Sequence, residues 1–412
     1  MADRKILVIV PYEFYPPKSG GALRCYHVIR EFAKYFKVAV ATSQYIDTTD
    51  KESRTIFQNV EFYFTGSNAT RYGLLKYIIP RRLLNYIFFR FLFHGKNKES
   101  VNSMFVDFYP AIRLALKKFS PEVVIFENLE SLYYLNEIVR KFDPKIKIVY
   151  EAHNVDHILW KKLAGVNNDK DLLKYSGNAL AVESALSRYT DCVVCVTKQD
   201  ELVLKKLNQG NHIVFTTVAS GVDTASKVPS SNALDEETTK ILFCGSLNYL
   251  PNSEGIKWFY INVMPWLRKK LNDFTIVIIG NAENLDEYAY LNGDPQVQLI
   301  GRVDDVTPYY HTSHLSIVPL LSGSGIRLKI MESMSYGCPV VSTTLGAEGI
   351  DYDEDSILIA DDPERFADGI VTLSRSNELR RKLGKNGRQL AESKYDWRML
   401  MNEFKNVIKN LN

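Results

Sequence analysis

A glycine-rich loop followed by a charged helix carries the clearest chemistry in this sequence. Residues 321–350 read LSGSGIRLKIMESMSYGCPVVSTTLGAEGI, with glycines before the expected helix and a second glycine turn after an apolar stretch. A helix that begins at such a loop presents unpaired backbone N–H groups and the positive end of its dipole, which attract phosphate. Arg327 and Lys329 add positive charge, and the Glu332 carboxylate can accept hydrogen bonds from ribose hydroxyls. The layout is typical of a nucleotide diphosphate site.

The same charged residues have a second interpretation. A solvated helix face also carries charges at spacings of three to five residues. A lone glycine-rich loop is a weak signal for nucleotide binding. From spacing alone, both interpretations stay open.

A longer pattern favours the first interpretation. The run from Gly323 to Met334 follows Gly-x-Gly-x-Arg-x-Lys-x-x-Glu-x-Met and resembles the donor-sugar motif of a branch of the retaining GT-B glycosyltransferases of family 4. The resemblance implies a catalytic role for Lys329 at the phosphates. It also implies donor contacts from Gly323, Ser324, Gly325, Ile326, Arg327 and Glu332.

Composition and charge indicate a globular protein of two domains. The chain has 412 residues, which is longer than a single hydrophobic core usually supports. Its content of 46% hydrophobic and 24% charged residues is ordinary for a globular protein. A net charge of +3 is too small to indicate nucleic acid as a partner. The five cysteines are scattered, and the N-terminus runs into an apolar stretch without a signal-peptide pattern, so we expect a cytoplasmic protein. Cys192 and Cys195 lie in an apolar run, which favours core packing over redox chemistry.

Apolar, β-branched runs alternate with helical stretches in two successive series, as in parallel sheets buried on both faces. The expected strands are Lys5–Pro11, Val38–Thr42, Val60–Phe64, Val123–Glu127, Ile146–Ala152, Cys192–Thr197, Ile213–Thr217, Ile241–Gly245, Thr275–Gly280, Val297–Gly301, Leu315–Val318, Pro339–Thr343 and Ile357–Ala360. We therefore predict an α/β fold of two doubly wound, Rossmann-like domains facing each other across a cleft. The resemblance makes this a GT-B fold, with an acceptor-binding domain at 1–225, a nucleotide-sugar-binding domain at 226–394, and a C-terminal helix at 395–412 that returns to the first domain.

A second glycine turn follows the first expected strand. Gly20 and Gly21 lie between that strand and a helix, at the carboxyl edge where open α/β sheets bind ligands. The turn is not G-x-G-x-x-G, which disfavours a dinucleotide oxidoreductase. The resemblance implies that Gly20, Gly21 and Arg24 reach the donor phosphates or the acceptor. A plain structural turn is the alternative.

His153 follows the strand that ends near Ala152, at the same edge of the sheet. The resemblance implies that it lies beside the reacting sugar, so we predict a catalytic role. A histidine that caps the next helix is one alternative. An H-x-x-x-H metal pair with His157 is another, but no carboxylate pattern supports it. We interpret His311 and His314 as structural.

The second series opens with Gly245 and Ser246 after its first strand, and these are predicted donor contacts. The chain departs here from the broader family. Gly245-Ser246 and Asn252-Ser253 replace the usual Gly-Arg and Lys, and the first glutamate of a Glu-x7-Glu motif falls at Ser324. Charge balance predicts that Arg327 and Lys329 supply the missing cations.

Residues 71–98 combine basic and aromatic side chains. The stretch from 62 to 98 contains no Asp or Glu, and its basic residues are Arg71, Lys76, Arg81, Arg82, Arg90, Lys96 and Lys98. No apolar run there reaches the ~18–20 residues that span a bilayer. The pattern is typical of a segment that lies on an anionic membrane surface, on the inner face of the membrane for a cytoplasmic protein. An ordinary helix pair on the first domain is the alternative.

These observations predict a retaining glycosyltransferase. It would move a hexose from a nucleotide diphosphate sugar to a hydroxyl of a glycan or lipid-linked acceptor, as in polysaccharide biosynthesis at the cell envelope. We expect no cofactor and no metal, since no D-x-D stands at a strand end. A GT-B nucleotide-sugar epimerase, a phosphorylase of related fold and a non-catalytic binding subunit remain alternatives. The sugar, base, linkage and acceptor are not encoded in these patterns.

Overall fold

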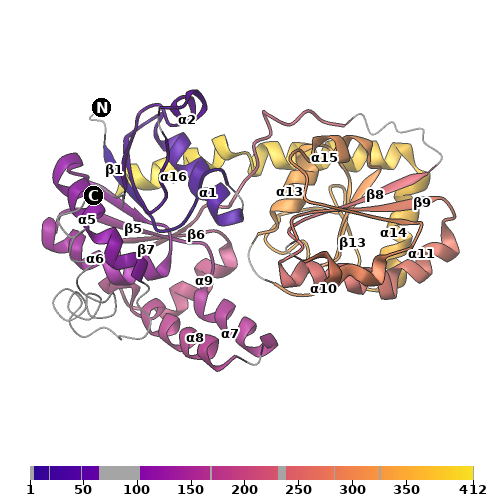
Figure 1. Cartoon of the computed structure of the whole chain (residues 1–412), viewed down its shortest axis with the longest axis horizontal. Helices are drawn as coiled ribbons and strands as arrows, with labels where there is room; N and C mark the ends of the chain where they lie inside the picture. Colours follow the sequence, from indigo (N-terminus) through magenta and orange to yellow (C-terminus); the bar gives the residue numbers. More distant parts are fainter. Residues whose placement is uncertain are drawn as a thin grey trace. The chain divides into compact units, whose positions relative to one another are not determined.

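The computed structural model describes residues 4–17, 19–47, 49–64, 103–167, 169–230, 238–282, 284–323 and 326–411, without the side chains of 103–107 and 166–167. The chain forms two compact units (Figure 1). The first unit is Met1–Val218 with Met401–Asn412, and the second is Ala219–Leu400. The second unit thus begins seven residues before the predicted start at 226.

The described part of the first unit contains a parallel sheet in the order β3-β2-β1-β4-β5-β6-β7. Its strands are β1 Lys5–Val10, β2 Lys37–Thr42, β3 Val60–Phe64, β4 Val123–Phe126, β5 Lys147–Ala152, β6 Cys192–Cys195 and β7 Val214–Thr217. The strand order reverses between β1 and β4. In open α/β sheets, ligands bind at the carboxyl ends of the strands beside such a reversal.

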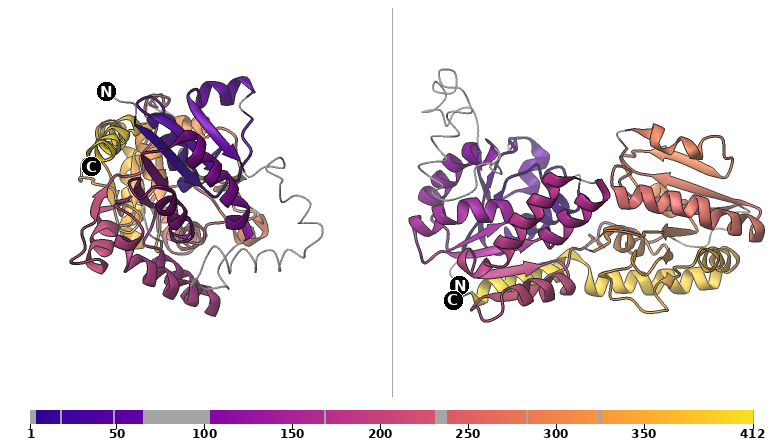
Figure 2. Two further views of the ribbon diagram at one scale, coloured as in Figure 1. Left: turned by 90° about the vertical axis from the view of Figure 1, so that its left-hand side faces the viewer. Right: turned by 90° about the horizontal axis from the view of Figure 1, so that it is seen from below.

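Helices flank this sheet on both faces (Figure 2). They are α1 Gly20–Phe32, α2 Lys51–Ile56, α5 Ser103–Phe119, α6 Leu129–Phe142, α7 Asp156–Asn167, α8 Lys170–Glu183, α9 Lys198–Leu207 and the 3₁₀ turn Leu186–Arg188. Polar side chains fix the starts of several of them, including α1 and α6. Ser19 Oγ accepts a hydrogen bond from Ala22 N, and Asn128 Oδ1 accepts one from Ser131 N. Both caps lie at the carboxyl edge of the sheet.

The last helix, α16 Trp397–Asn410, completes the first unit. Its Phe404 is fully buried and meets Phe32 of α1 edge to face, with ring centroids 4.9 Å apart. Arg4, just before β1, donates hydrogen bonds to the carbonyl oxygens of Ile408 and Leu411. The end of α16 is therefore part of the core of the first unit.

The second unit has a parallel sheet in the order β10-β9-β8-β11-β12-β13, with the reversal between β8 and β11. Its strands are β8 Thr239–Cys244, β9 Phe274–Ile279, β10 Val297–Gly301, β11 Leu315–Val318, β12 Val340–Ser342 and β13 Leu358–Ile359. Its helices are α10 Leu250–Trp258, a π-helical stretch Phe259–Val263, α11 Met264–Lys270, the 3₁₀ helix Leu285–Leu291, α12 Thr307–Thr312, α13 Leu328–Ser335, α14 Pro363–Arg375 and α15 Asn377–Lys394.

The predicted fold class of two doubly wound, Rossmann-like domains is confirmed. Cys192 and Cys195 are buried in β6 as free thiols, as core packing requires. One detail was wrong: Arg327 is the residue before α13 rather than part of the helix. Within the described residues, no helix combines the length and the apolar character needed to cross a membrane.

Candidate functional site

Lys329 is the centre of a polar cluster in the second unit. It stands in the first turn of α13, and its ammonium lies against the loop that follows β8. A Cβ built on Gly245 would come within 2.8 Å of Lys329 Nζ, so only glycine leaves room for the ammonium there. Nζ donates a hydrogen bond to Asn252 Oδ1 and lies 4.5 Å from the centroid of the Phe243 ring.

The ammonium of Lys329 is held in surroundings that do not favour its charge. Burial lowers the pKa of Lys329 to about 7, an effect that the charge of Arg327 reinforces and Cys244 opposes. A phosphate placed beside Nζ would supply the missing negative charge. The geometry therefore suits an anionic ligand at this strand end.

Asn252 connects Lys329 to the glycine turn. Its Nδ2 donates to the carbonyl oxygen of Ser246 at 2.6 Å, while its Oδ1 accepts from Lys329. Ser246 itself is exposed. Sequence reasoning treated Asn252 only as a replacement for a family cation and missed this bridging role. Asn252 is a polar residue at the start of a helix beside a predicted phosphate loop, and this position could have identified it from the sequence.

Arg327 lies under the glycine-rich loop. Its side chain is 5% exposed, and its guanidinium is 3.9 Å from Glu348. A Cβ on Gly323, which has a φ of +112°, would come within 3.0 Å of Arg327 Nη2. Backbone and guanidinium therefore pack directly together. Ile326 is described and lies against Gly349, but the predicted contacts Ser324 and Gly325 lie outside the described residues.

Glu332 faces the same strand end from the second turn of α13. Its Oε2 is 4.0 Å from Cys244 Sγ, and burial raises the pKa of its carboxyl while Lys227 and Tyr310 oppose that effect. Lys227 Nζ lies 4.9 Å from the centroid of the Tyr336 ring. The sequence analysis missed Lys227, because it lies in a polar stretch without a motif. Within the second unit, Gly245, Lys329 and Glu332 therefore lie around the end of β8.

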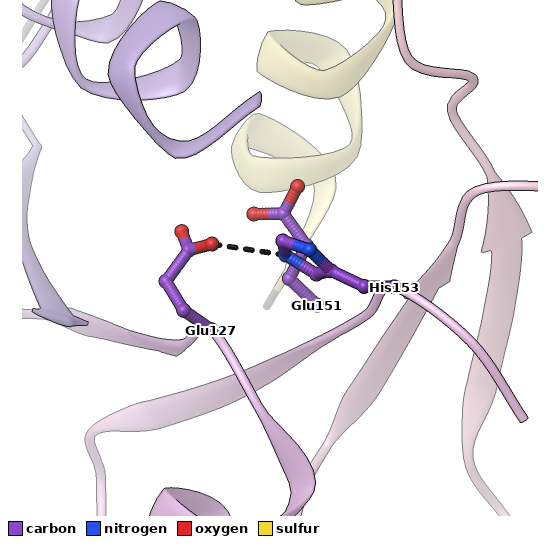
Figure 3. Close-up of side chains that lie close together, drawn as sticks. All are labelled: Glu127, Glu151 and His153. Carbon is purple, nitrogen blue, oxygen red and sulfur yellow. Dashed lines mark hydrogen bonds and ion pairs between the residues drawn. The ribbon is translucent and has the colours of Figure 1, made fainter. Parts of the chain in front are cut away.

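A second cluster lies at the reversal of the first sheet, formed by Glu127, Glu151 and His153 (Figure 3). Glu127 directly follows β4, Glu151 is the second-last residue of β5 and His153 directly follows β5. His153 Nε2 is 3.1 Å from Glu127 Oε2, which also accepts a hydrogen bond from Tyr12 at 3.4 Å. On the other side, Arg24 Nε donates to Glu151 Oε1.

Burial controls the protonation of this cluster. Burial raises the pKa of Glu127 to about 7, although hydrogen bonds with Glu151 and Tyr12 and the charge of Arg24 act to lower it. Burial and the charge of Glu127 also raise the pKa of Glu151 to about 7, while the charge of Arg24 acts to lower it. The two carboxyl groups therefore share a proton near neutral pH. Burial lowers the pKa of His153 to about 4, so the imidazole is neutral at pH 7.

The contact with Glu127 assigns the tautomer of His153 when Glu127 is the ionised carboxyl of the pair. Its Oε2 then accepts from Nε2 as well as from Tyr12, so Nε2 carries the proton and Nδ1 is left as an acceptor. A Cβ on Gly21 would lie 3.1 Å from Nδ1, so the glycine turn passes directly beside this nitrogen. Gly20 is the first residue of α1. The imidazole opens onto a cavity of about 260 Å³ that Tyr12 and Gly21 also line.

The carboxylate and imidazole atoms of this cluster lie within 4.8 Å of one another, close enough to hold a cation. Arg24 already supplies positive charge to Glu151, which disfavours a divalent ion there. The predicted absence of a metal stays a prediction. In the alternative metal pair, His153 lies with Glu127 and Glu151, whereas His157 Nδ1 lies 2.5 Å from Glu183 Oε2.

Arg24 lies beside this cluster. Its side chain is fully buried and paired with Glu151, so it is not exposed as a cleft-facing arginine would be. Its contact with the donor phosphates or the acceptor stays a prediction. Glu127 and Glu151 were missed altogether. Glu127 ends one expected strand, and the next expected strand leads into His153. The order of these two strands could have identified Glu127 as a neighbour of His153. Glu151 lies inside β5 among apolar residues and gave none.

His311 and His314 were interpreted as structural, and their contacts agree. His311 Nε2 lies 2.8 Å from the carbonyl oxygen of Val228, and His314 Nδ1 accepts a hydrogen bond from Lys240 N at 3.1 Å.

Residues 238–376 match the family model described as glycosyl transferases group 1. A relative, the uncharacterized 44.6 kDa protein in the cps region of Klebsiella pneumoniae, is 28% identical over 171 residues, which are 39% of this chain and 44% of that protein. The chain thus spans under half the length of that relative.

Two solved structures share the fold over 99% of this chain. Sucrose-phosphate synthase from Thermosynechococcus elongatus is 15% identical with a TM-score of 0.72 over 99% of its own chain. HepE from Anabaena in complex with UDP and glucose is 13% identical with a TM-score of 0.67 over 100% of its chain. The fold is therefore GT-B, and the cluster around Lys329 lies in the segment that matches the group 1 model.

Proposed function

We propose that this protein is a retaining GT-B glycosyltransferase that moves a hexose from a nucleotide diphosphate sugar to a hydroxyl of a glycan or lipid-linked acceptor. The observation that carries the proposal is the Lys329 ammonium, held against Gly245 at the end of β8 with its pKa lowered to about 7. A partly buried cation that is costly to keep charged is suited to an anion that arrives with the ligand.

The donor is assigned to the second unit. Lys329 and Arg327 bind the diphosphate, and Glu332 binds the ribose hydroxyls. The match of residues 238–376 to glycosyl transferases group 1 supports this assignment. The complex of HepE with UDP and glucose shows that a protein of the same fold binds such a nucleotide.

The sugar is assigned to His153. Its neutral imidazole presents Nδ1 as an acceptor, which suits a sugar hydroxyl as the donor. In this proposal the leaving phosphate takes the proton of the acceptor hydroxyl on the same face of the sugar, so the anomeric configuration is retained. The resemblance of the Gly323–Met334 motif supports retention.

A panel of nucleotide sugars with different bases and hexoses tests the proposal. Melting is followed by differential scanning fluorimetry, and donor consumption is followed with and without saccharide acceptors. A ligand at 100 times its dissociation constant adds about 2.7 kcal/mol of stability, so one nucleotide sugar should raise the melting temperature. Epimerisation without an acceptor, or binding without consumption by any acceptor, would replace the transferase by an epimerase or a binding subunit. A panel without any shift contradicts a donor site.

We also propose, from sequence alone, that residues 71–98 bring the protein to an anionic membrane surface; they lie outside the described residues. Each basic residue near such a surface contributes about 1 kcal/mol, screened within about 8–10 Å at physiological salt. Flotation with anionic vesicles should exceed flotation with neutral ones and weaken as salt rises. Replacing Arg81, Arg82 and Arg90 with Glu should abolish it, while catalysis on a soluble acceptor analogue persists. Equal flotation of both proteins would show that the segment is not a membrane contact.

A further inference from the structure

The first unit contains an aromatic cavity that the proposed mechanism does not use. It has a volume of about 170 Å³ and lies among α6, α7, α8 and the turn before β6. Its aromatic lining is Tyr133, Tyr134, Trp160, Tyr175 and Tyr189. Sites for drug-sized ligands occupy about 300–1,000 Å³, so this cavity is suited to a smaller group such as a single ring.

The aromatic rings are held in place by one another. Trp160 of α7 meets Tyr175 of α8 edge to face at 5.6 Å, and Tyr133 of α6 meets Tyr189 in the same way at 5.7 Å. Fixed aromatic faces carry negative quadrupole charge and attract the weakly positive C–H groups of a saccharide ring. Rigid rings also lose little entropy when a ligand binds.

Polar groups complete the lining. Tyr175 donates a hydrogen bond to Glu130 Oε1, and Asp156 and Asn178 also line the cavity. The backbone N–H of Asp156 is held by Glu183 at 2.7 Å, which fixes the start of α7. Burial, with the charges of Glu183 and Glu130, raises the pKa of Asp156 to about 8. A protonated carboxyl both donates and accepts hydrogen bonds, as a neutral polyol requires.

Asp156 also lines the cavity onto which His153 opens. Asp156 therefore borders both the aromatic cavity and the space beside the proposed sugar-binding histidine. A ligand in the aromatic cavity would lie next to the reacting centre. This adjacency distinguishes it from a cavity between α5 and α6, which Asp156 does not line.

We propose that the aromatic cavity binds one saccharide ring of the acceptor, stacked on Trp160 and hydrogen-bonded by Asp156. The proposal rests on the proposed function, because a transferase to glycans needs a site that holds the acceptor next to the reacting sugar. It also names the chemistry of that acceptor: a neutral pyranose, rather than a lipid chain, occupies the position nearest His153.

The experiment measures binding of methyl hexopyranosides, of gluco, galacto and manno configuration in both anomers, to the full chain without nucleotide. Saturation-transfer NMR detects the ligand protons in contact, and a titration gives the dissociation constant. At least one methyl hexopyranoside should bind, with saturation concentrated on its ring C–H groups. Trp160→Ala and Asp156→Leu should each raise the dissociation constant at least tenfold.

Two further variants separate binding from folding. Tyr133→Phe keeps the ring and should change the dissociation constant less than about threefold. Tyr35→Ala removes an exposed aromatic side chain, 51% accessible, at the opposite edge of the sheet and should change nothing. If Trp160→Ala unfolds the unit, Asp156→Leu decides the matter, since leucine has a similar size but forms no hydrogen bond to the saccharide.

Several results would overturn the proposal. These are the absence of binding by every methyl hexopyranoside, equal binding by wild type and both cavity variants, preferential binding of tetramethylammonium, or binding of octyl glucoside with saturation on its alkyl chain alone. Nucleotide-sugar binding is measured on the same samples and involves the second unit. Retained nucleotide-sugar binding with no saccharide binding refutes only this cavity, whereas loss of both refutes the proposed function.

Discussion

Lys329→Met is expected to weaken nucleotide-sugar binding at least tenfold without lowering the melting temperature of the free protein. Hydrogen bonds to charged groups contribute about 1.5–3 kcal/mol, and every 1.4 kcal/mol is tenfold in affinity. Burial already lowers the pKa of Lys329 to about 7, so the free protein gains little from its charge. Methionine is nearly as long as lysine, and its thioether packs well against aromatic rings such as that of Phe243.

The same residue predicts a pH dependence. Above pH 7 Lys329 is mainly neutral in the free protein, while a bound diphosphate favours the ammonium and raises its pKa. Binding should therefore take up close to one proton at pH 8, and affinity should fall as pH rises through 7 to 9. A nucleotide sugar is the suitable ligand, because its esterified diphosphate does not titrate in this range.

Calorimetry in buffers of different ionisation enthalpy measures this uptake, and Lys329→Met should abolish it. Lys257→Met is the matched control, an exposed lysine on α10 of the same unit, and should leave affinity and proton uptake unchanged. Glu332→Ala should also weaken binding at least tenfold but keep the proton uptake. Unchanged affinity in both Lys329→Met and Glu332→Ala would remove the donor site from the end of β8.

His153→Ala is expected to lower turnover at least a hundredfold and to change nucleotide affinity less than about twofold. Groups that act on protons or hydroxyls at a reacting centre contribute about 10²–10⁴-fold, and the proposed contact of His153 is with the sugar. Steady-state turnover and a separate nucleotide titration distinguish the two effects. His212→Ala, an exposed histidine of the same unit, is the control.

Glu127→Gln tests whether the carboxylate sets the tautomer of His153. The glutamine amide can donate to Nε2, which moves the imidazole proton to Nδ1 and removes the acceptor from the cavity. Turnover should fall at least tenfold, and ¹⁵N shifts of the imidazole should report the exchanged tautomer. Turnover within about twofold of wild type in His153→Ala would make the histidine structural, whatever Glu127→Gln shows.

The sheets and the donor loop were predictable because their signals are local. Apolar β-branched runs such as Val123–Phe126 and Cys192–Cys195 are buried on both faces, so their sequence is nearly continuous in hydrophobic residues. The motif around Lys329 is contiguous, in the glycine-rich loop and the helix α13 that follows it. Both signals are complete within a short window of sequence.

The carboxyl cluster was not predictable in the same way. Glu151 lies in a strand among apolar neighbours, and its partner Arg24 is 127 residues away in the sequence. Their pairing arises only when β5 and α1 are placed against the same sheet. The burial of Arg24 was unpredictable for the same reason, because helix position alone does not tell whether an arginine faces a ligand or a buried glutamate.

The contact between α16 and α1 also affects the order in which the chain can fold during synthesis. Residues 219–400 are continuous, so the second unit has all its parts as soon as it leaves the ribosome. The first unit, although its sheet is made first, lacks Phe404 and the carbonyl partners of Arg4 until residues 401–411 emerge. Domains generally fold N-terminal first during synthesis, but here the Phe32 face of α1 stays uncovered while the whole second unit is translated. The first unit is thus translated first but is the last to complete its fold.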